Sequence, residues 1–392
     1  MKNVSTKQLR STGDSVAGFL LMGCAVLSLV LANTPLGETY LSFWNRSIGG
    51  HPLSHWIDDG LMAIFFLLVG LELKHEVMYG TLSSWRKALL PILAAVGGMV
   101  VPVLVYLCFN WGRPTQEGFG IPMATDIAFV LAVLALLGSR VPPALKVFLL
   151  ALAVVDDLGA VLVIAIFYTA EINIIFLLLS IVLFALLFLL GHSSCSKDGR
   201  SILIVVCLYL VGGAGLWYFI MRSGVHATIS GVLLAMTIPS CEGVDASPSH
   251  RLQQWLHKPV YLFVLPLFVL ANTAIMMGGI VMTGFTLWQS LVTMFQQPHV
   301  LGIAVGLFFG KPLGIMMGVY VAIQYLGVDM PEGLSCSHFL AASMLGGVGF
   351  TMAIFITVLS FENAYFIDTA KVAILVSSLL AAIVGAALMS KK

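Results

Sequence analysis

Charged side chains are scarce in this sequence. Only 9% of its 392 residues are Asp, Glu, Lys or Arg, whereas soluble domains carry about 25%. The net charge is +1, so nothing indicates a nucleic acid or another strongly charged partner. Because 59% of the residues are hydrophobic and the mean hydropathy is +1.03, the sequence predicts an integral membrane protein.

Motifs for disulfide, metal and phosphate chemistry are also lacking. The six cysteines are scattered and include no Cys-x-x-Cys pair, which argues against a secreted disulfide framework and indicates free thiols. Gly310-Lys311 is followed by Pro312, so the remainder of a phosphate-binding loop is missing. We therefore expect no cofactor and no enzymatic activity.

Apolar segments separated by short polar turns fill the length of the chain. A helix that crosses a membrane needs about 20 apolar residues, and twelve segments approach that length. They lie at residues 15–34, 58–73, 88–109, 121–138, 144–169, 174–191, 201–220, 224–240, 258–277, 298–325, 338–360 and 369–389. We expect an all-α polytopic membrane protein in which residues 1–392 form a single transmembrane domain of twelve helices.

Basic residues are unevenly divided among the connections. With the N-terminus placed inside, four fall in outside loops, namely Arg46, Arg113, Arg222 and Lys371. Fourteen fall inside, namely Lys2, Lys7, Arg10, Lys74, Arg86, Lys87, Arg140, Lys146, Lys197, Arg200, Arg251, Lys258, Lys391 and Lys392. Since cytoplasmic loops carry the excess of Lys and Arg, both termini are predicted to be cytoplasmic. No small-x-small cleavage site follows the first apolar run, which favours a retained span over a signal peptide.

Two adjacent carboxylates, Asp156 and Asp157, stand in the middle of the apolar run 144–168. A charge at bilayer depth costs about 2.5–3.5 kcal/mol on insertion scales, so placing two side by side is hard to explain as structure alone. Asp126 and Lys311 also fall inside predicted spans. Buried structural ion pairs are the alternative explanation. Three acids and one base do not balance, which favours a functional site.

The geometry of a helix suggests what the doublet binds. Successive positions differ by about 100°, so one aspartate can face a water-filled cavity while the other faces a helix that carries Lys311. Two like charges roughly 6 Å apart repel by about 2.8 kcal/mol at an effective dielectric near 20, which favours a bound proton or cation. Carboxylates and a hydroxyl such as that of Thr125 suit hard cations, whereas zinc and copper prefer His or Cys. A calcium or magnesium ion remains an alternative. The positive charge of Lys311, which competes for the same carboxylates, favours a monovalent ion.

Two predicted spans carry signals for a break. Gly346, Gly347 and Gly349 lie in the eleventh, and each glycine weakens a helix by about 1 kcal/mol. Unwound backbone at membrane depth is tolerated where it lines a cavity, while close helix packing through small residues is the alternative. The fourth span has a candidate break at Thr125-Asp126, where Asp126 could neutralise helix N-termini. Paired interruptions are typical of transporter binding sites between inverted repeats.

Several short motifs occur in a specific order along the chain. They are Ala124-Thr-Asp-Ile-Ala-Phe129, Leu137-Gly-Ser-Arg-Val-Pro142, Val155-Asp-Asp-Leu-Gly-Ala160, Ser223-Gly-Val-His-Ala-Thr228, Gly310-Lys-Pro-Leu-Gly314 and Gly346-Gly-Val-Gly-Phe-Thr-Met352. In these residues the sequence closely resembles the NhaA family of bacterial sodium/proton antiporters, nearly end to end. That family is itself an example of inverted-repeat architecture. The resemblance implies twelve helices, with spans four and eleven unwound and crossing near the membrane centre.

The resemblance also implies an activity and residue roles. The activity is electrogenic exchange of cytoplasmic Na⁺ or Li⁺ for external protons, by alternating access, in the bacterial inner membrane. Asp157 matches the family's principal ion-binding aspartate, Asp156 its proton-carrying neighbour, and Lys311 the lysine that pairs with Asp156. The Na⁺ ligands would thus be Asp156 and Asp157. Thr125 and Asp126 match the residues at the break in span four.

The family's pH response is matched only in part. By resemblance the residues concerned are Asp59, Glu72, Glu76, His226 and His257. Among them, Asp59 and Glu72 match acids near the cytoplasmic funnel. His75 stands where the family has an Arg, and Gln253 and Gln254 replace an acid and a histidine. The transport chemistry looks intact, but the pH profile does not follow from the resemblance.

Partners and alternatives complete the expectations. Membrane lipid, Na⁺, Li⁺ and H⁺ are the expected partners. The connection after the first span is shorter than the family's dimerising hairpin, but residues 44–55 could still form a small hairpin, so a homodimer is expected. A sodium-coupled organic-anion symporter is the alternative function, although few polar side chains are present for a larger substrate. An intramembrane aspartyl protease would need aspartates from separate segments.

Overall fold

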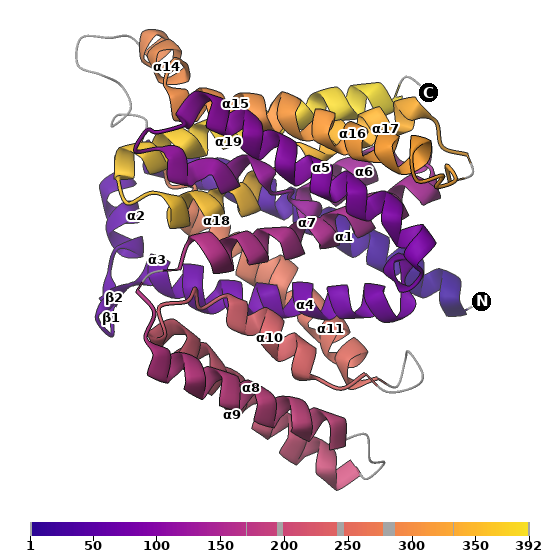
Figure 1. Cartoon of the computed structure of the whole chain (residues 1–392). Coiled ribbons are helices and arrows are strands. Elements are labelled where there is room, and N and C mark those ends of the chain that lie inside the picture. Colours follow the sequence, from indigo (N-terminus) through magenta and orange to yellow (C-terminus); the bar gives the residue numbers. More distant parts are fainter. Residues whose placement is uncertain are drawn as a thin grey trace. The chain divides into compact units, whose positions relative to one another are not determined.

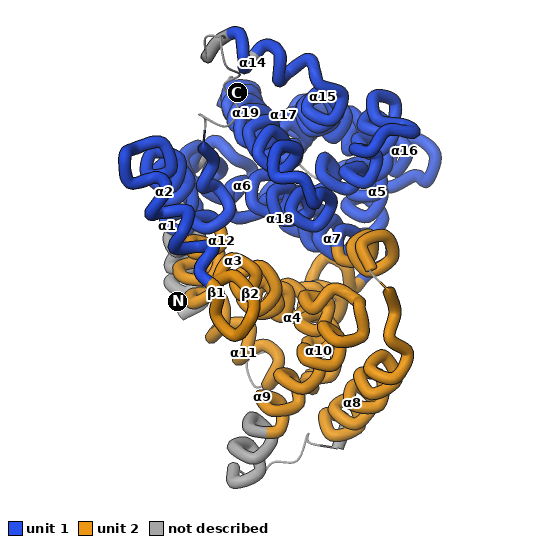
Figure 2. The backbone as a smooth tube through the Cα atoms, turned by 90° about the vertical axis from the view of Figure 1, so that its left-hand side faces the viewer, with its two compact units in different colours: residues 1–46, 84–160, 269–392 blue, residues 47–83, 161–268 orange. Residues whose placement is uncertain are grey.

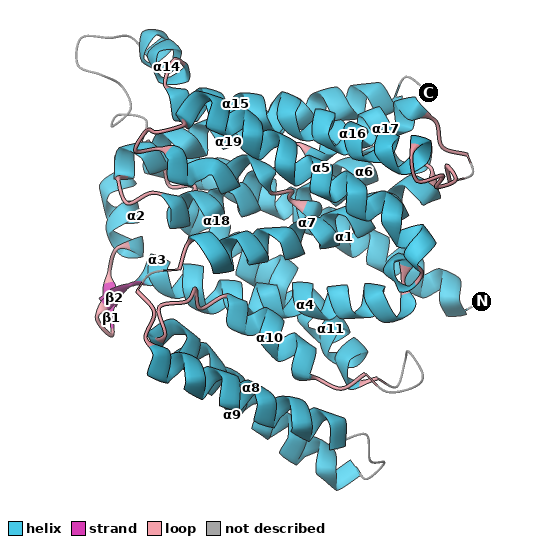
Figure 3. Ribbon diagram, in the orientation of Figure 1, coloured by secondary structure: helices cyan, strands magenta, loops and turns pink. Residues whose placement is uncertain are grey.

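The structure is a computed structural model that describes residues 2–169, 171–193, 199–240, 247–276, 287–331 and 333–390. Helices form nearly all of its regular structure (Figures 1 and 3). In chain order the elements are α1 (Lys2–Ala32), α2 (Gly37–Trp44), β1 (Ser47–Ile48), β2 (His51–Pro52), α3 (Leu53–Trp56), η1 (Ile57–Leu61), α4 (Met62–Tyr79), η2 (Thr81–Ser83), α5 (Trp85–Asn110), η3 (Gln116–Met123), α6 (Ile127–Leu137), η4 (Gly138–Arg140), α7 (Pro143–Phe167), α8 (Ile174–Ser193), α9 (Gly199–Arg222), α10 (Ile229–Thr237), α11 (Pro248–Pro259), η5 (Val260–Val264), α12 (Leu265–Asn272), α14 (Leu287–Phe295), α15 (Pro298–Val305), η6 (Gly306–Gly310), α16 (Lys311–Gln324), α17 (Cys336–Gly346), α18 (Phe350–Ser360) and α19 (Ala364–Ser390). The elements named η are π or 3₁₀ turns.

Within the described residues, seven helical stretches are long and apolar enough to cross a membrane. They are Trp85–Asn110, Gln116–Leu137, Pro143–Phe167, Ile174–Gly191, Pro248–Asn272, Pro298–Gln324 and Ala364–Ser390. Two bent pairs, α1 with α2 and α17 with α18, raise the number to nine if each pair is one span. α10 has only nine residues and is about 13 Å long, shorter than a bilayer core of about 30 Å. The fold is therefore that of an all-α polytopic membrane protein.

Contacts divide the chain into two compact units (Figure 2). Unit 1 comprises residues 1–46, 84–160 and 269–392, and unit 2 comprises residues 47–83 and 161–268. Each unit is thus assembled from segments far apart in sequence. The predicted acids and base of the ion site, Asp126, Asp156, Asp157 and Lys311, all belong to unit 1.

Close backbone approach joins the helices of unit 1. A Cβ atom added at Gly97 of α5 would lie 2.1 Å from the carbonyl oxygen of Gly314 in α16, and one added at Gly314 would lie 2.1 Å from that of Gly97. Gly18 of α1 is equally tight, because a Cβ there would lie 2.2 Å from the Cβ of Ala132 in α6. Small residues therefore set how closely these helices pack.

Unit 2 is built around α4. α10 packs on it so closely that a Cβ added at Gly231 would lie 2.1 Å from the carbonyl oxygen of Ala63. α8 and α9 lie side by side as an antiparallel pair within the unit (Figure 1). The small hairpin expected at residues 44–55 is confirmed in its tip, where β1 pairs with β2 and the turn is made by Gly49 and Gly50, both with positive φ (Figure 3).

The sequence predicts Lys371 in an outside loop, which is wrong, because Lys371 lies inside α19 and is only 8% exposed. α19 begins at Ala364, five residues before the predicted start of the last span, because the Asn363 side chain accepts a 2.9 Å hydrogen bond from the backbone N–H of Tyr365 there. Lys371 and Asp368, which interact electrostatically, are both on this first part of the helix.

The contact between α5 and α16 gives a direct test of the packing. We expect Gly97→Ala to destabilise the protein by about 1–3 kcal/mol, because the added methyl group meets a backbone oxygen that cannot move aside cheaply. Gly23→Ala in α1 is the matched control, since a Cβ there meets nothing within 4 Å. Thermal unfolding of the purified protein measures both. Equal melting temperatures for the two variants would contradict the close approach.

Candidate ion-binding site

Two helical stretches of unit 1 are interrupted at the positions that the sequence marked. The backbone between η3 and α6 leaves the helical conformation at residues 124–126. Between α17 and α18 the regular helix is interrupted at residues 347–349, where the two helices bend by 43°, although Gly347 and Gly349 keep right-handed helical backbone angles. Gly347 has φ −71° and Gly349 φ −91°, so these glycines are not needed for a left-handed conformation. Space is the reason, because a Cβ at Gly347 would lie 2.5 Å from the carbonyl oxygen of Leu307.

Asp126 ties the two breaks together. Its Oδ1 accepts a 3.0 Å hydrogen bond from the backbone N–H of Phe129, so it is the N-cap of α6. Its Oδ2 accepts bonds from the backbone N–H of Thr351 at 3.0 Å and from the Thr351 hydroxyl at 2.6 Å. The backbone N–H of Asp126 donates to the carbonyl of Val348 at 2.7 Å. The carboxylate thus faces the N-terminal ends of both α6 and α18, where a negative charge is stabilised.

Thr125 adds a second link between the breaks. Its hydroxyl donates a 3.0 Å hydrogen bond to the carbonyl of Gly346, the last residue of α17. This carbonyl is at a helix C-terminus, where backbone oxygens lack partners within the helix. Thr125 is 2% exposed and Asp126 is 2% exposed, so both bonds are buried. The Thr125 hydroxyl therefore uses its hydrogen to link the two breaks.

Lys311 forms a buried ion pair with Asp156. The Lys311 Nζ lies 2.6 Å from Oδ2 of Asp156, and it also donates to the carbonyl of Met123, directly before the first break. Lys311 is 0% exposed and Asp156 is 1% exposed. Removing one partner of such a pair leaves the other charge buried alone, which costs about 3–5 kcal/mol. The lysine that the resemblance pairs with Asp156 is thus in contact with it.

The second oxygen of Asp156 is different. Among the described residues, no hydrogen-bond donor reaches its Oδ1, although the atom is buried. Asp157, the next residue of α7, is buried as well at 4% exposure, and it points about 100° further around the helix. An unsatisfied buried polar atom costs about 1–3 kcal/mol. A small cation or a proton on the carboxyl group would remove that cost.

The sequence does not indicate a function for two residues of this region. Thr351 belongs to one of the motifs, and Ser378 lies in α19 outside all of them. The Ser378 hydroxyl oxygen accepts 3.2 Å bonds from the backbone N–H groups of Gly349 and Phe350, the first turn of α18. Hydroxyl groups are common in apolar helices, and nothing in the sequence indicates which ones face a broken helix elsewhere in the chain.

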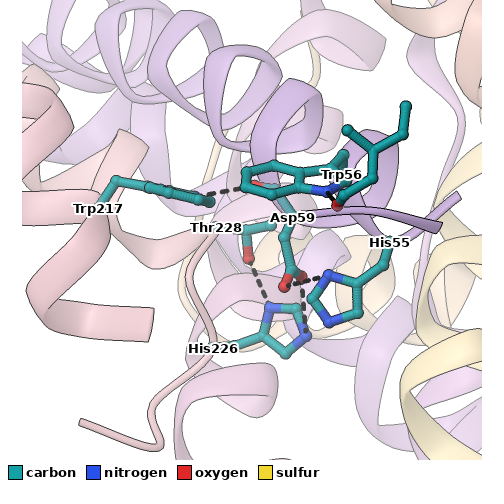
Figure 4. Close-up of polar contacts among 7 residues, drawn as sticks. His55, Trp56, Asp59, Trp217, His226 and Thr228 are labelled. Atoms are coloured by element: carbon teal, nitrogen blue, oxygen red, sulfur yellow. Dashed lines mark hydrogen bonds and ion pairs between the residues drawn. The ribbon is translucent and has the colours of Figure 1, made fainter. Parts of the chain in front are cut away.

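The residues predicted for the pH response fall into two groups in unit 2. Asp59 and Glu72 lie 13 positions apart on the continuous helix formed by η1 and α4, about 20 Å along its axis. Around Asp59, His55 Nδ1 lies 3.4 Å from Oδ2 and His226 Nε2 lies 3.9 Å from Oδ1 (Figure 4). His226 also contacts the Thr228 hydroxyl at 3.2 Å. Asp59 and His226 therefore form one site, which Glu72 does not share.

Electrostatics at His226 follow from this arrangement. The residue lies in the loop between α9 and α10, and its side chain is 15% exposed. Burial lowers the pKa of His226 below its usual range, the Asp59 carboxylate opposes that effect, and His55 adds to it. Burial is thus the largest influence on the pKa of His226, and Asp59 and His55 modify it in opposite directions.

The other predicted pH residues lie further along α4 and on α11. Glu76 Oε2 accepts bonds from the backbone N–H and the hydroxyl of Thr81, just after the end of α4. His75, the departure from the family, stacks on His250 of α11 with ring centres 4.8 Å apart. His257 lies against Tyr261, 4.6 Å between ring centres.

Two histidines near the predicted ends of spans are buried. His250 is 7% exposed and His299 is 2% exposed. Gln254 Nε2 lies 2.9 Å from His250 Nε2, and Gln253, which replaces an acid of the family, is 5% exposed. Partners on other segments bury these side chains, and the sequence does not reveal those partners.

Comparison with known proteins places the chain in a family. A family model described as Na⁺/H⁺ antiporter 1 matches residues 9–389. The chain belongs to this family. The Na(+)/H(+) antiporter NhaA of Dechloromonas aromatica (strain RCB) is 49% identical over 377 residues, which cover 95% of this chain and 92% of that protein. The protein of the same name from Flavobacterium psychrophilum is 47% identical over 372 residues, again 95% and 92%. That of Vibrio parahaemolyticus is 44% identical over 380 residues, 96% and 94%.

Membership of the Na⁺/H⁺ antiporter 1 family covers every residue of the site, since the match includes both breaks and the Lys311–Asp156 pair. Together with the apolar helices, it makes this chain a multi-pass membrane protein. The family resemblance inferred from the sequence motifs is thereby confirmed.

The bonds to Ser378 test whether the broken helix of this antiporter-family protein is held from α19. We expect Ser378→Ala to destabilise the protein by about 1–3 kcal/mol, because two buried N–H groups lose their acceptor. Ser360→Ala is the control, since that buried hydroxyl donates only to the Ile356 carbonyl of its own helix. Thermal unfolding of both purified variants is the measurement. A melting temperature of Ser378→Ala no lower than that of Ser360→Ala would contradict the role.

Proposed function

We propose that this chain is an electrogenic antiporter that extrudes cytoplasmic Na⁺ or Li⁺ in exchange for external protons. Family membership supports the reaction, because the relatives described above are Na⁺/H⁺ antiporters. The observation in the structure that carries the proposal is the half-satisfied carboxylate of Asp156, buried beside Asp157 and held by Lys311. The ions are the transported substrates, and the protein needs no cofactor for this exchange.

The proposed mechanism is competition between Na⁺ and protons for the aspartate doublet. Asp156 Oδ2 is already bound to Lys311, so its Oδ1 is the oxygen left for a cation, and the buried carboxylate of Asp157 is the next residue of α7. Carboxylate oxygens suit a hard cation. Full ionisation would add two adjacent negative charges to one positive charge in an apolar interior, which is unfavourable unless a cation is present. Na⁺ binding therefore drives protons off, and protons at higher concentration drive Na⁺ off.

Asp126 has a different role in this proposal. Its two oxygens already accept three hydrogen bonds, which leaves little reason to take up an ion. Asp126 and Thr125 instead hold the interrupted stretches η3–α6 and α17–α18 together beside the ion pair. We infer that these stretches are the unwound, crossing spans four and eleven of inverted repeats, in a single domain with twelve membrane crossings. Movement of one helix group would then open the site alternately to the two sides.

Location, regulation and assembly follow the same reasoning. The excess of Lys and Arg in alternate loops supports cytoplasmic termini in a bacterial inner membrane. Control by pH would involve the Asp59–His226 group at one end of η1–α4, and Glu72, Glu76 and His257 elsewhere in unit 2. The β1–β2 hairpin is the segment that supports a homodimer. None of the relatives described above favours the organic-anion symporter considered earlier.

The role of Asp157 can be tested in sealed vesicles. We expect Asp157→Asn to abolish Na⁺-dependent proton flux, because an amide at this position can neither release a proton nor supply a carboxylate to Na⁺. Asp126→Asn is the comparison, where weakened flux is expected, since an amide keeps one acceptor for the bonds between the breaks. Fluorescence of a pH-sensitive dye on addition of Na⁺ reports the flux. Undiminished exchange in Asp157→Asn vesicles would refute the assignment.

A further inference from the structure

A groove in unit 2 lies among η1–α4, α9 and α10, and no residue of the proposed ion site lines it. Its volume is about 380 Å³, and its walls are almost entirely apolar, with Leu67 and Leu234 among them. The lining residues Ile64 and Leu210 are 37% and 69% exposed, so the groove continues into an exposed apolar surface. In a protein of a membrane antiporter family, an exposed apolar surface of this kind is suited to contact with lipid.

The hollow is open at one of the glycines that line it. A Cβ atom added at Gly60 would meet no other atom within 4 Å, so this position opens into free space. Along α9 the lining runs from Tyr209 to Trp217, eight positions or about 12 Å. The hydrocarbon core of a bilayer is about 30 Å thick, so the groove has roughly the depth of one leaflet.

One end of the groove is amphipathic. Trp56 and Trp217 line it with ring centres 6.1 Å apart. Trp217 Nε1 donates to the backbone carbonyl of Asp59 at 3.2 Å, and Trp56 Nε1 donates to the carbonyl of Ile48 in β1 at 2.9 Å (Figure 4). Tryptophan prefers the boundary between hydrocarbon and headgroups. The polar group around Asp59 thus marks the headgroup end, and the wall beyond it is suited to hydrocarbon.

We propose that this groove binds one acyl chain of a membrane phospholipid, with the ester end of the chain at Trp56 and Trp217. Shape, length and polarity agree on this occupant: a leaflet-deep apolar hollow that is open to the lipid surface and has indoles at its polar end. The lipid would pack against the same two indoles that hydrogen-bond to the Asp59 carbonyl and to the hairpin. The proposal depends on membrane embedding and is independent of which ion is transported.

The first test uses phospholipids with brominated acyl chains, since bromine quenches nearby tryptophan fluorescence. Two full-length variants are reconstituted into phosphatidylcholine vesicles, one retaining only Trp217 and the other only Trp85, with Phe at the remaining tryptophan positions. Trp85 is 74% exposed on unit 1 and reports ordinary lipid contact. Gly60→Leu is then added to each variant to fill the groove. We expect Gly60→Leu to remove quenching at Trp217 and to leave quenching at Trp85 unchanged.

A second measurement tests the proposal without the single-tryptophan variants, and so does not depend on their folding. Native mass spectrometry of the purified chain, which keeps all its tryptophans, counts retained phospholipid molecules. We expect the unsubstituted protein to retain one phospholipid that Gly60→Leu loses. Gly23→Leu in α1 is the matched control, because that glycine also has open space at its Cβ position, and it should keep the lipid.

Three results would overturn the proposal. The first is quenching at Trp217 that Gly60→Leu does not change, which would mean that lipid contacts only the outer surface. The second is equal lipid retention by Gly60→Leu and the unsubstituted protein. The third is quenching at Trp217 that disappears as the protein-to-lipid ratio rises, which would mean that a second copy of the chain covers the groove.

Discussion

A carboxylate buried in an apolar interior needs a partner for each oxygen, and unit 1 is organised by how Asp126 and Asp156 meet that need. Both carboxylate oxygens of Asp126 accept hydrogen bonds, from donors in α6 and α18. Only Oδ2 of Asp156 has a partner, which is Lys311. The helices break where backbone N–H groups are required as donors, so the breaks and the buried charges are parts of one arrangement.

The different hydrogen bonding of the two aspartates gives them different roles in the proposed function. Asp126 holds the structure together, and Asp156 exchanges ions. A carboxylate with three hydrogen bonds is stable as it stands, and it holds two interrupted helices in a fixed relation. A carboxylate with an orphan oxygen has a lower free energy when a proton or a cation is added. While no proton or cation is bound, the ammonium group of Lys311 compensates the negative charge of the Asp156 carboxylate. The proposed function therefore assigns unit 1 a structural joint at Asp126 and an exchangeable position at Asp156 and Asp157.

Much of this arrangement could be predicted from the sequence, because charge is conspicuous in an apolar chain. Asp126, Asp156, Asp157 and Lys311 stand out by their position in apolar runs, and glycine clusters mark helix breaks. What the sequence could not predict depends on contacts between distant segments. The Ser378 hydroxyl lies 29 positions from Gly349 and reaches it only because α19 packs on α18.

Burial depends on contacts that the sequence does not show. His250 and His299 lie near the predicted ends of spans, yet neighbouring helices cover both. The hollow at Gly60 was not predicted either, since a glycine in a helix looks the same in sequence whether it packs closely, as Gly97 does, or lines open space. Only the facing helix decides between these two cases.

The central claim is that one buried doublet holds either protons or Na⁺. Proton release from the purified protein in weakly buffered solution, recorded over a range of pH as salts are added, tests it most directly. The claim predicts that Na⁺ and Li⁺ acidify the solution, that K⁺ does not, and that Asp156→Asn with Asp157→Asn abolishes the response. No acidification by Na⁺ at any pH where the protein is folded, or equal acidification by K⁺, would contradict it.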